Sequence, residues 1–384
     1  MSEHPILDWD PRDVSVLRDQ RRAYDELRER CPVAHDSFLG WSLFRQHDIV
    51  SVLADPETFS NASEYRSVPN GMDPPDHTRY RRALEPYFRP ERMHALEPRC
   101  RRIAVDLLRA CPKRDEVEFI AEFAQPFPVK THCAFSGWSP ETWTNLRDWA
   151  RRNQAAALSP NQETGTALAR EFAGYVSDAL RVRRKTGIAV SDDVITSLLG
   201  TAVEGTALSD EDIVSILRNW TASCATMAAA LGILVFHLAT HPDMQERLRR
   251  EPSLLAAAIE EILRTDGPLV ANHRTATREV EIADRRIGAG EQLSLNWIAA
   301  NRDGGAIDDP VAVHLDRDHG DNLLFGAGIH YCQGAPFARL QLRVAMEELL
   351  RCTTTIELGA SEPPRRDVYP SNGFLTMPVC LRAS

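Results

Sequence analysis

The amino-acid sequence predicts a mainly α-helical protein with small β-sheets, forming a single domain over residues 1–384. Apolar residues recur at helical spacing along most of the chain, which is the pattern of amphipathic helices. No internal repeat, low-complexity linker or change of composition marks a second domain. Hydrophobic residues make up 43% and charged residues 26% of the chain, proportions that suit a globular protein with a sizeable core.

Eight segments have the helical pattern, and short strands are expected between them. In the segment 280–297, Gly288–Gly290 favours a turn between strands. The predicted helices are Val14–Arg30, Arg92–Cys111, Pro140–Arg151, Thr164–Thr186, Asp192–Leu199, Asp210–Thr240, Leu254–Arg264 and Ala335–Arg351.

The helix over Asp210–Thr240 is unusually long. Ser209 and Asp212 have the spacing of a capping box at its start, and His241-Pro242 ends it. At about 1.5 Å per residue it would be about 45 Å long. Its centre, "TASCATMAAALG", is small on nearly every face. This composition indicates either tight helix packing or a bulky, flat group lying against the helix.

Charge and hydropathy restrict the partners. The formal net charge of −10 argues against nucleic acid as the main partner. No apolar run approaches the roughly 20 residues that span a bilayer. The amino end, "MSEHPILDWDP", is acidic and polar, unlike a signal peptide or an anchor. We therefore expect a cytoplasmic protein that binds neither nucleic acid nor a membrane.

One of the eight cysteines has unusual neighbours. The cysteines show no CxxC spacing, and cytosolic thiols stay reduced, so seven are expected to be small apolar residues of the interior. Cys332 instead lies in "FGAGIHYCQG", a glycine-rich loop directly before a helix. A helix amino terminus favours a thiolate, and the glycines allow close approach of the backbone. Such a loop suits a thiolate ligand of haem iron, with Phe325 covering the sulfur.

The spacing F-x-x-G-x-x-x-C-x-G, carried by Phe325, Gly328, Cys332 and Gly334, resembles the haem-binding loop of the cytochrome P-450 superfamily. Four further segments, in the family's order, resemble its other motifs: "DPPDHTRYRR", Glu261–Arg264 as E-x-x-R, "AANRD" at 299–303, and Arg317. The resemblance implies the cytochrome P-450 fold, with haem between the long "I" helix at 210–240 and the Cys332 loop with the helix that follows it. It also implies heme b (iron protoporphyrin IX) as cofactor, with Cys332 as the metal ligand.

The same resemblance implies roles around the haem. Glu261, Arg264 and Arg317 would lock the scaffold of the loop. Singly, each proposed cofactor contact could be an ordinary surface ion pair, but their convergence on the two haem propionates favours binding. The cofactor-binding residues so implied are His77, Arg81, Arg274 and His330 for the propionates, and Phe325, Gly326, Cys332 and Gly334 in the loop.

Three positions depart from the family pattern. The long helix would carry Ala222, Ser223, Ala225 and Thr226 over the iron as the catalytic segment. Thr226 is retained, and its hydroxyl is expected to bond back toward the carbonyl of Ala222. Ala225 stands where the family usually has an acid, and Ser223 where it has a glycine. Gln333, where an apolar residue is usual, is expected to make a polar contact near the sulfur.

The leading interpretation is a haem-thiolate monooxygenase that inserts one oxygen atom from O2 into a small or medium organic substrate. Electrons would come from a separate ferredoxin and ferredoxin reductase. A basic patch for the ferredoxin, or else ordinary solvated arginines, is formed by Arg79, Arg82, Arg89, Arg339 and Arg343. The segments expected to contact substrate are Tyr65–Gly71, 222–229, 269–273 and 373–375, with Tyr65, Arg66 and Asn272 as polar candidates.

Two alternatives remain. The missing acid at Ala225 suggests an atypical haem-thiolate enzyme, either peroxide-driven or catalysing coupling, desaturation or rearrangement. The second alternative is a haem protein without catalysis, such as a gas sensor or a degenerate partner subunit, and the presence of Cys332 argues against it.

Overall fold

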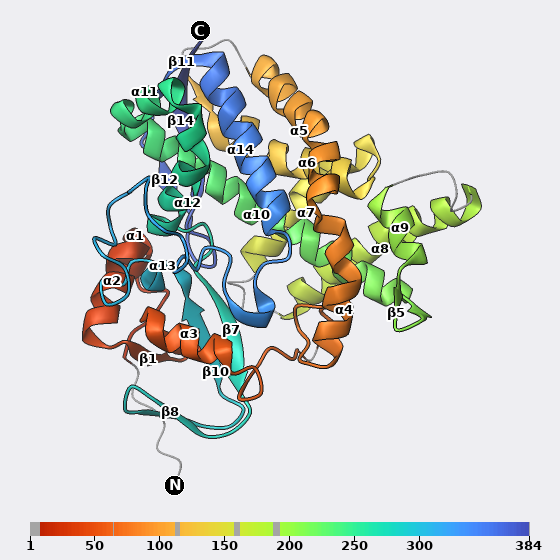
Figure 1. Cartoon of the computed structure of the whole chain (residues 1–384), viewed down its shortest axis with the longest axis vertical. Coiled ribbons are helices and arrows are strands. Elements are labelled where there is room, and N and C mark those ends of the chain that lie inside the picture. Colours follow the sequence, from red (N-terminus) through yellow and green to blue (C-terminus); the bar gives the residue numbers. More distant parts are fainter. Residues whose placement is uncertain (1–7, 64, 112–115, 157–161, 187–192, 384) are drawn as a thin grey trace. The chain divides into compact units, whose positions relative to one another are not determined.

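The computed structural model describes residues 8–63, 65–111, 116–156, 162–186 and 193–383 (Figure 1). The protein is mostly helical (57%) with small sheets, as the sequence predicts. The chain forms two compact units, and each is built from separate stretches of sequence. The first comprises residues 1–63, 256–332 and 367–372; the second comprises 64–255, 333–366 and 373–384.

The first unit is built on a five-stranded sheet in the order β1-β2-β10-β7-β3. β10 pairs in parallel with β2, and the other neighbours are antiparallel. Its strands are β1 (Val33–Asp36), β2 (Gly40–Leu43), β3 (Phe59–Ser60), β7 (Ala271–Ala276) and β10 (Gln292–Asn296), with a hairpin of β8 (Val280–Ile282) and β9 (Arg285–Ile287). Its helices are α1 (Val14–Arg18), α2 (Gln20–Arg30), α3 (Gln46–Ala54), α12 (Leu255–Thr265) and α13 (Trp297–Ala300), with a 3-10 turn at Gly328–His330.

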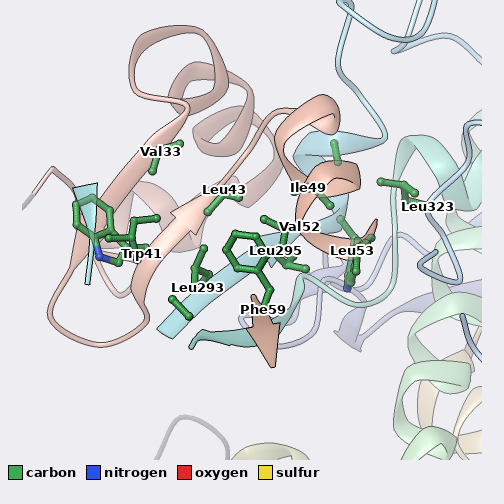
Figure 2. Packing of buried hydrophobic residues seen from close by; sticks show 14 residues of the cluster. Val33, Trp41, Leu43, Ile49, Val52, Leu53, Phe59, Leu293, Leu295 and Leu323 are labelled. Carbon is green, nitrogen blue, oxygen red and sulfur yellow. The ribbon is translucent and has the colours of Figure 1, made fainter. Parts of the chain in front are cut away.

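A hydrophobic cluster fills the space between this sheet and α3 (Figure 2). Leu43, Leu293 and Leu295 come from the sheet, Ile49 and Leu53 from α3, and all five are buried. Removing apolar side chains from water is the main favourable term in folding, so this cluster gives the first unit its rigid base. Leu323 also joins the cluster, two residues before the glycine-rich loop begins.

The glycine-rich loop lies directly on this base. Gly328 has a φ of +67°, and a Cβ built there would lie 2.6 Å from the backbone oxygen of Leu53. Gly326 has a φ of +70°, and a Cβ there would lie 4.0 Å from the Trp297 ring. At Gly328 only glycine combines a left-handed backbone with so close an approach, whereas at Gly326 glycine is favoured by φ alone. The glycine of F-x-x-G is therefore a packing requirement.

The second unit is mostly helical. Its helices are α4 (Asp76–Leu84), α5 (Pro90–Ala110), α6 (Pro126–Ser136), α7 (Trp143–Ala156), α8 (Gln162–Thr186), α9 (Val194–Gly200), α10 (Asp210–Thr240), α11 (Pro242–Arg250) and α14 (Ala335–Cys352). Short helical turns lie at Glu85–Phe88, Ile120–Ala124, Pro140–Thr142 and Pro252–Leu254. Its strands are β4 (Val117–Glu118), β5 (Ala202–Val203), β6 (Thr206–Ala207), β11 (Thr353–Leu358), β12 (Arg365–Arg366), β13 (Phe374–Thr376) and β14 (Pro378–Ala383).

The helix α10 has the predicted bounds and the predicted capping box. Ser209 Oγ accepts from the Asp212 N–H at 3.1 Å, and Asp212 Oδ2 accepts from the Ser209 N–H at 3.0 Å. Contrary to expectation, α10 contains a stretch of 18 residues that is long and apolar enough to cross a membrane. However, 61% of that stretch is buried inside the protein, as in the core helix of a soluble protein.

The other helix predictions differ from the structure in identifiable ways. Residues 14–30 form two helices, because Asp19 caps a second one by accepting from the Arg22 N–H at 3.2 Å. α3, α4, α6, α11 and the four-residue α13 were not predicted. Pro126 and Pro242 begin helices here, since proline is tolerated in the first turn. Asp192, the predicted start of one helix, lies outside the described residues, and α9 begins at Val194.

The contact between Gly328 and Leu53 leads to a prediction. Gly328→Ala combines a left-handed φ, which costs about 1–2 kcal/mol for an L-residue, with a backbone clash that requires the loop to move. The matched control is Gly290→Ala, because Gly290 has a φ of +85° but nothing within 4 Å of the added Cβ. Denaturant unfolding should show a larger loss for Gly328→Ala, and equal losses in the two variants would contradict the packing argument.

Candidate functional site

The Cys332 loop closes on itself. The Cys332 N–H donates to the Phe325 carbonyl at 2.9 Å, which makes the two ends of the motif neighbours. The rings of Phe325 and Tyr331 lie 6.4 Å apart. Cys332 is exposed, whereas the other seven cysteines are buried or half-buried. The loop therefore presents one accessible thiol just ahead of the amino end of α14.

A buried ion cluster holds the segment that leads into this loop. Arg264 on α12 donates to both carboxylate oxygens of Glu261, at 2.7 and 3.1 Å. Its remaining N–H groups donate to the backbone oxygens of Asn301 (2.7 Å), Pro310 (2.7 Å) and Ala312 (2.9 Å). The guanidinium thereby binds three points of the chain between β10 and the loop, as predicted for the scaffold.

The connection continues from Asn301 to the loop. Asn301 Oδ1 accepts from the Leu323 N–H at 2.7 Å, and Leu323 is part of the hydrophobic cluster. Arg317 completes the cluster by donating to Glu261 at 3.2 Å and to the carbonyls of Asp308 and Asp309. The Glu-Arg-Arg set thus acts on the thiol loop through backbone groups.

Glu261 is charged in this environment. Burial alone would raise the pKa of its carboxyl, but hydrogen bonds from Arg264, the His314 N–H and Arg317 outweigh burial and hold the pKa below its ordinary value. A buried carboxylate paired in this way maintains its charge at neutral pH.

The predicted propionate partners are distributed over both units. In the first unit, Arg274 on β7 is buried and donates to Asn61 Oδ1 at 2.8 Å and to the His273 carbonyl at 2.7 Å. His330 is half-buried in the loop. In the second unit, His77 (buried) and Arg81 (half-buried) are four residues apart and therefore share one face of α4.

A stripe of small side chains is accessible in the middle of α10. Ser223 is exposed, and Ala222, Ala225 and Thr226 are half-buried. On either side, Thr221 and Cys224 are buried, and the helix is then continuously buried from Met227 to Val235. An accessible face of methyl and hydroxyl groups within a core helix can pack against a flat ligand.

The hydroxyl groups of this helix are arranged differently from the prediction. Thr226 was expected to bond back to the Ala222 carbonyl, but within the described residues its side chain makes no hydrogen bond. The back-bonding hydroxyls are Thr221, donating to the Leu217 carbonyl, and Ser223, donating to the Trp220 carbonyl, both at 2.7 Å. The rotamers of Thr221 and Ser223 are fixed by these bonds, whereas the Thr226 hydroxyl keeps its proton for another acceptor.

His132 on α6 is a neighbour of α10 that the sequence analysis missed. It is buried, its Nε2 lies 2.9 Å from Thr221 Oγ1, and Ser136 Oγ lies 3.3 Å from the same nitrogen. Because Thr221 uses its proton on the Leu217 carbonyl, Nε2–H must be the donor to Thr221. Burial lowers the pKa of His132 to about 4, so the ring is neutral at pH 7. His132 anchors the turn that precedes Ala222.

Two of the predicted substrate-contact segments pack on α10. Arg66 donates through Nε to Asp212 Oδ1 at 2.7 Å and through Nη2 to the Tyr80 hydroxyl at 3.2 Å. Ser215 Oγ accepts from the Val68 N–H at 2.8 Å and donates to the Arg66 carbonyl at 3.1 Å. Arg66 is therefore held by the first turn of α10 while its side chain stays 47% exposed, and its contact with substrate stays a prediction.

The other segment approaches α10 at Gly373, which precedes β13. A Cβ at Gly373 would lie 2.5 Å from the Cβ of Ala229, so a larger residue cannot be placed there without moving the strand. Leu375, two residues further on, is 48% exposed. This contact fixes how closely the start of β13 approaches α10.

The proposed basic patch is smaller than predicted. Arg343 donates to Glu97 at 2.7 Å and to Glu347 at 2.9 Å, and Arg79 pairs with Asp76 and Glu204. These two arginines are neutralised by carboxylates. Arg82, Arg89 and Arg339 are exposed.

The residues present fit a haem-thiolate group. Cys332 supplies a soft sulfur ligand, and the glycines beside it let the backbone approach closely. Arg274 and Arg81 supply cationic groups of the kind that bind carboxylates. The small face of α10 offers room for a flat ring.

A protein-family model described as cytochrome P450 matches residues 157–378. The chain belongs to the cytochrome P450 family. Vitamin D(3) 25-hydroxylase of Pseudonocardia autotrophica is 32% identical over 380 residues, covering 94% of this chain and 93% of that protein. Cyclomarin C epoxidase CymV of Salinispora arenicola (strain CNS-205) is 31% identical over 362 residues, covering 89% and 90%.

Solved structures agree with this assignment. A mutant of EryK in complex with erythromycin B has a TM-score of 0.88 at 27% identity, covering 96% of this chain and 97% of that one. The structure of CalO2 has a TM-score of 0.87 at 29% identity, covering 98% and 100%. The protein is accordingly a haem-thiolate monooxygenase, an oxidoreductase whose cofactor is heme b.

The ion cluster leads to a prediction about stability and pH. Glu261→Gln should cost about 3–5 kcal/mol of unfolding free energy, because it leaves buried guanidinium groups without their counter-charge. Since the folded-state pKa of Glu261 is lowered, its contribution is fully present above the ordinary pKa of a Glu, about 4.3, and is lost as the pH falls through the folded-state value. The difference between wild type and variant should therefore shrink in acid.

Urea unfolding at a series of pH values measures this difference. Glu357→Gln is the matched control, because Glu357 pairs with Arg382 at the surface and should contribute less than about 1 kcal/mol. A loss for Glu261→Gln as small as that of the control would show that the cluster does not hold the scaffold.

Proposed function

We propose that this protein is a soluble, cytoplasmic monooxygenase that acts as one functional domain over residues 1–384. It inserts one oxygen atom from O2 into a small or medium organic molecule, using electrons from a separate ferredoxin and ferredoxin reductase. The observation that carries the proposal is the accessible Cys332 thiol in the family's loop, held on a buried base. Similar proteins named as hydroxylases and an epoxidase support hydroxylation or epoxidation as the outcome.

Cys332 is assigned as the iron ligand, and Phe325, Gly326 and Gly334 as the frame of its loop. When bound, the haem supplies the activation of O2 and the transfer of one oxygen atom to substrate. His77, Arg81, Arg274 and His330 are assigned to the propionates. Arg274 suits this role because it is buried and its guanidinium is the kind of cationic group that binds a carboxylate.

Ala222, Ser223, Ala225 and Thr226 are assigned to the oxygen-binding side. Thr221 and Cys224 do not suit proton supply, because Thr221 is bonded to Leu217 and His132 and burial raises the pKa of the Cys224 thiol. The Ser223 hydroxyl donates its hydrogen bond to the Trp220 carbonyl. Thr226 is therefore the hydroxyl of this segment that can hold a water molecule and pass a proton.

The electron-donor site is assigned to the exposed arginines Arg82, Arg89 and Arg339. Arg82 lies on α4, Arg89 is the N-cap of α5, and Arg339 lies near the start of α14. An acidic ferredoxin would be guided to such a patch by charge, and the association rate would fall as salt is added.

The second candidate is an atypical haem-thiolate reaction: peroxide-driven oxygenation, or coupling, desaturation or rearrangement. The methyl group of Ala225, which cannot supply a proton, favours it. Turnover with hydrogen peroxide alone, compared with NADPH plus a ferredoxin and its reductase, separates the two. Faster product formation with peroxide would replace the leading proposal.

The substrate is proposed to meet the segments around Tyr65, Asn272 and Leu375. Tyr65 is 66% exposed. Asn272 Oδ1 accepts from the Trp297 indole N–H at 2.9 Å, which fixes the orientation of the amide. The compounds that shift the resting Soret band from low to high spin would identify the substrate class.

The first test concerns the iron ligand. The reduced, CO-bound protein should show the red-shifted Soret band of thiolate ligation, and Cys332→Ser should abolish this band. Cys352→Ser is the control, because Cys352 is half-buried at the end of α14, outside the loop. An imidazole-type CO spectrum from freshly prepared wild type would refute the proposal.

The second test concerns the propionate partners. Arg274→Ala and Arg81→Ala should each weaken haem binding about 10- to 100-fold, since a charge-assisted hydrogen bond contributes about 1.5–3 kcal/mol. The ratio of haem to purified protein measures this loss. Arg278→Ala is the control, because the Arg278 side chain is 71% exposed. Unchanged haem occupancy and thermal stability in both variants would remove these residues from the site.

A further inference from the structure

Gln333 follows Cys332 and precedes Gly334, the N-cap of α14. The sequence analysis expected its side chain near the sulfur. Its amide nitrogen instead donates to the backbone carbonyl of Arg81 at 2.9 Å. A carbonyl only accepts, so the nitrogen and not the oxygen of the amide must face Arg81. The residue next to the iron ligand is thereby bonded to the backbone of a residue assigned to the propionates.

The bond reaches α4 at a position where a tertiary contact has a large effect. α4 has nine residues, and a helix of this length is marginal on its own. Its N-cap, Pro75, makes no side-chain capping bond. Of its nine residues only His77 and Leu84 are buried. Hydrophobic packing therefore contributes little to fixing α4, and directed hydrogen bonds matter more.

The acceptor is suited to a second bond. The Arg81 carbonyl already accepts from the Glu85 N–H, which closes the last turn of α4. A carbonyl has two lone pairs, so the Gln333 amide occupies acceptor capacity that the helix leaves unused. It also places a donor at the carboxyl end of the helix, where the helix dipole favours positive charge.

From these contacts we infer that Gln333 is a positioning residue: it fixes α4, with His77 and Arg81, to the residue that follows the thiolate ligand. The two attachments of the haem, at the iron and at a propionate, are then coupled through one amide side chain. The inference rests on the proposed propionate role of Arg81. An apolar residue at 333 would leave the two attachments independent.

The experiment compares Gln333→Leu and Gln333→Glu with Gln341→Leu. Gln341 lies on α14, the helix that follows Gln333, is buried, and donates to Thr131 Oγ1 on α6 at 2.6 Å, so its loss removes an amide hydrogen bond that does not involve α4. Haem transfer from each holoprotein to excess apomyoglobin gives the rate of haem loss. Hydrogen–deuterium exchange of residues 76–88 reports on α4, and the reduction potential reports on the sulfur.

Gln333→Leu should release haem about 3- to 10-fold faster, the range expected for one net hydrogen bond, with faster exchange in α4 and an unchanged reduction potential. Gln333→Glu should accelerate haem release and exchange in α4 at least as much as Gln333→Leu, because an ionised carboxylate cannot donate to the Arg81 carbonyl. Gln341→Leu should destabilise the protein without accelerating α4 exchange or haem loss.

Three outcomes would overturn the inference: unchanged haem loss in Gln333→Leu, equal acceleration in Gln341→Leu, or a shifted reduction potential with unchanged exchange in α4. The last would restore a role at the sulfur. Failure of the proposed function is distinguishable, because it would appear in wild type as the absence of a thiolate-type CO spectrum.

Discussion

The first unit depends on the charge of one buried guanidinium. Arg264 is almost fully buried, and such a group is costly unless each donor finds an acceptor. Glu261 and three backbone carbonyls provide these acceptors, so the irregular segment after β10 is held by electrostatics where no regular ladder exists. The hydrogen bond from the Leu323 N–H to Asn301 connects the thiol loop to this segment and so positions the loop.

The second unit depends on a different constraint, which is the size of side chains on α10. Alanine, serine and glycine let neighbouring segments approach its backbone, as Gly373 does at Ala229. The same small residues leave an accessible stripe at Ala222 and Ser223. Close packing on one face and openness on another come from one composition, so the tight packing expected from the sequence is confirmed, and a flat group against the open face stays a prediction.

Sequence patterns predicted what local physics decides. The bounds of α10 follow from a capping box and a His-Pro pair, and the cysteine loop follows from its spacing. Three of the missed helices have conflicting local signals: α4 is too polar to show an apolar face, and prolines, which usually break helices, begin α6 and α11. Contacts between distant residues, such as His132 with Thr221 or Arg66 with Asp212, leave no trace in a single sequence. These contacts also determine which hydroxyl and guanidinium groups are already engaged in hydrogen bonds within the protein.

Asp212 has two tasks at once, closing the capping box of α10 and holding Arg66. A residue shared in this way limits how the protein can diversify. In a library intended to broaden the range of compounds accepted, randomising Arg66, Asp212 or Ser215 would disturb the start of the core helix together with the loop.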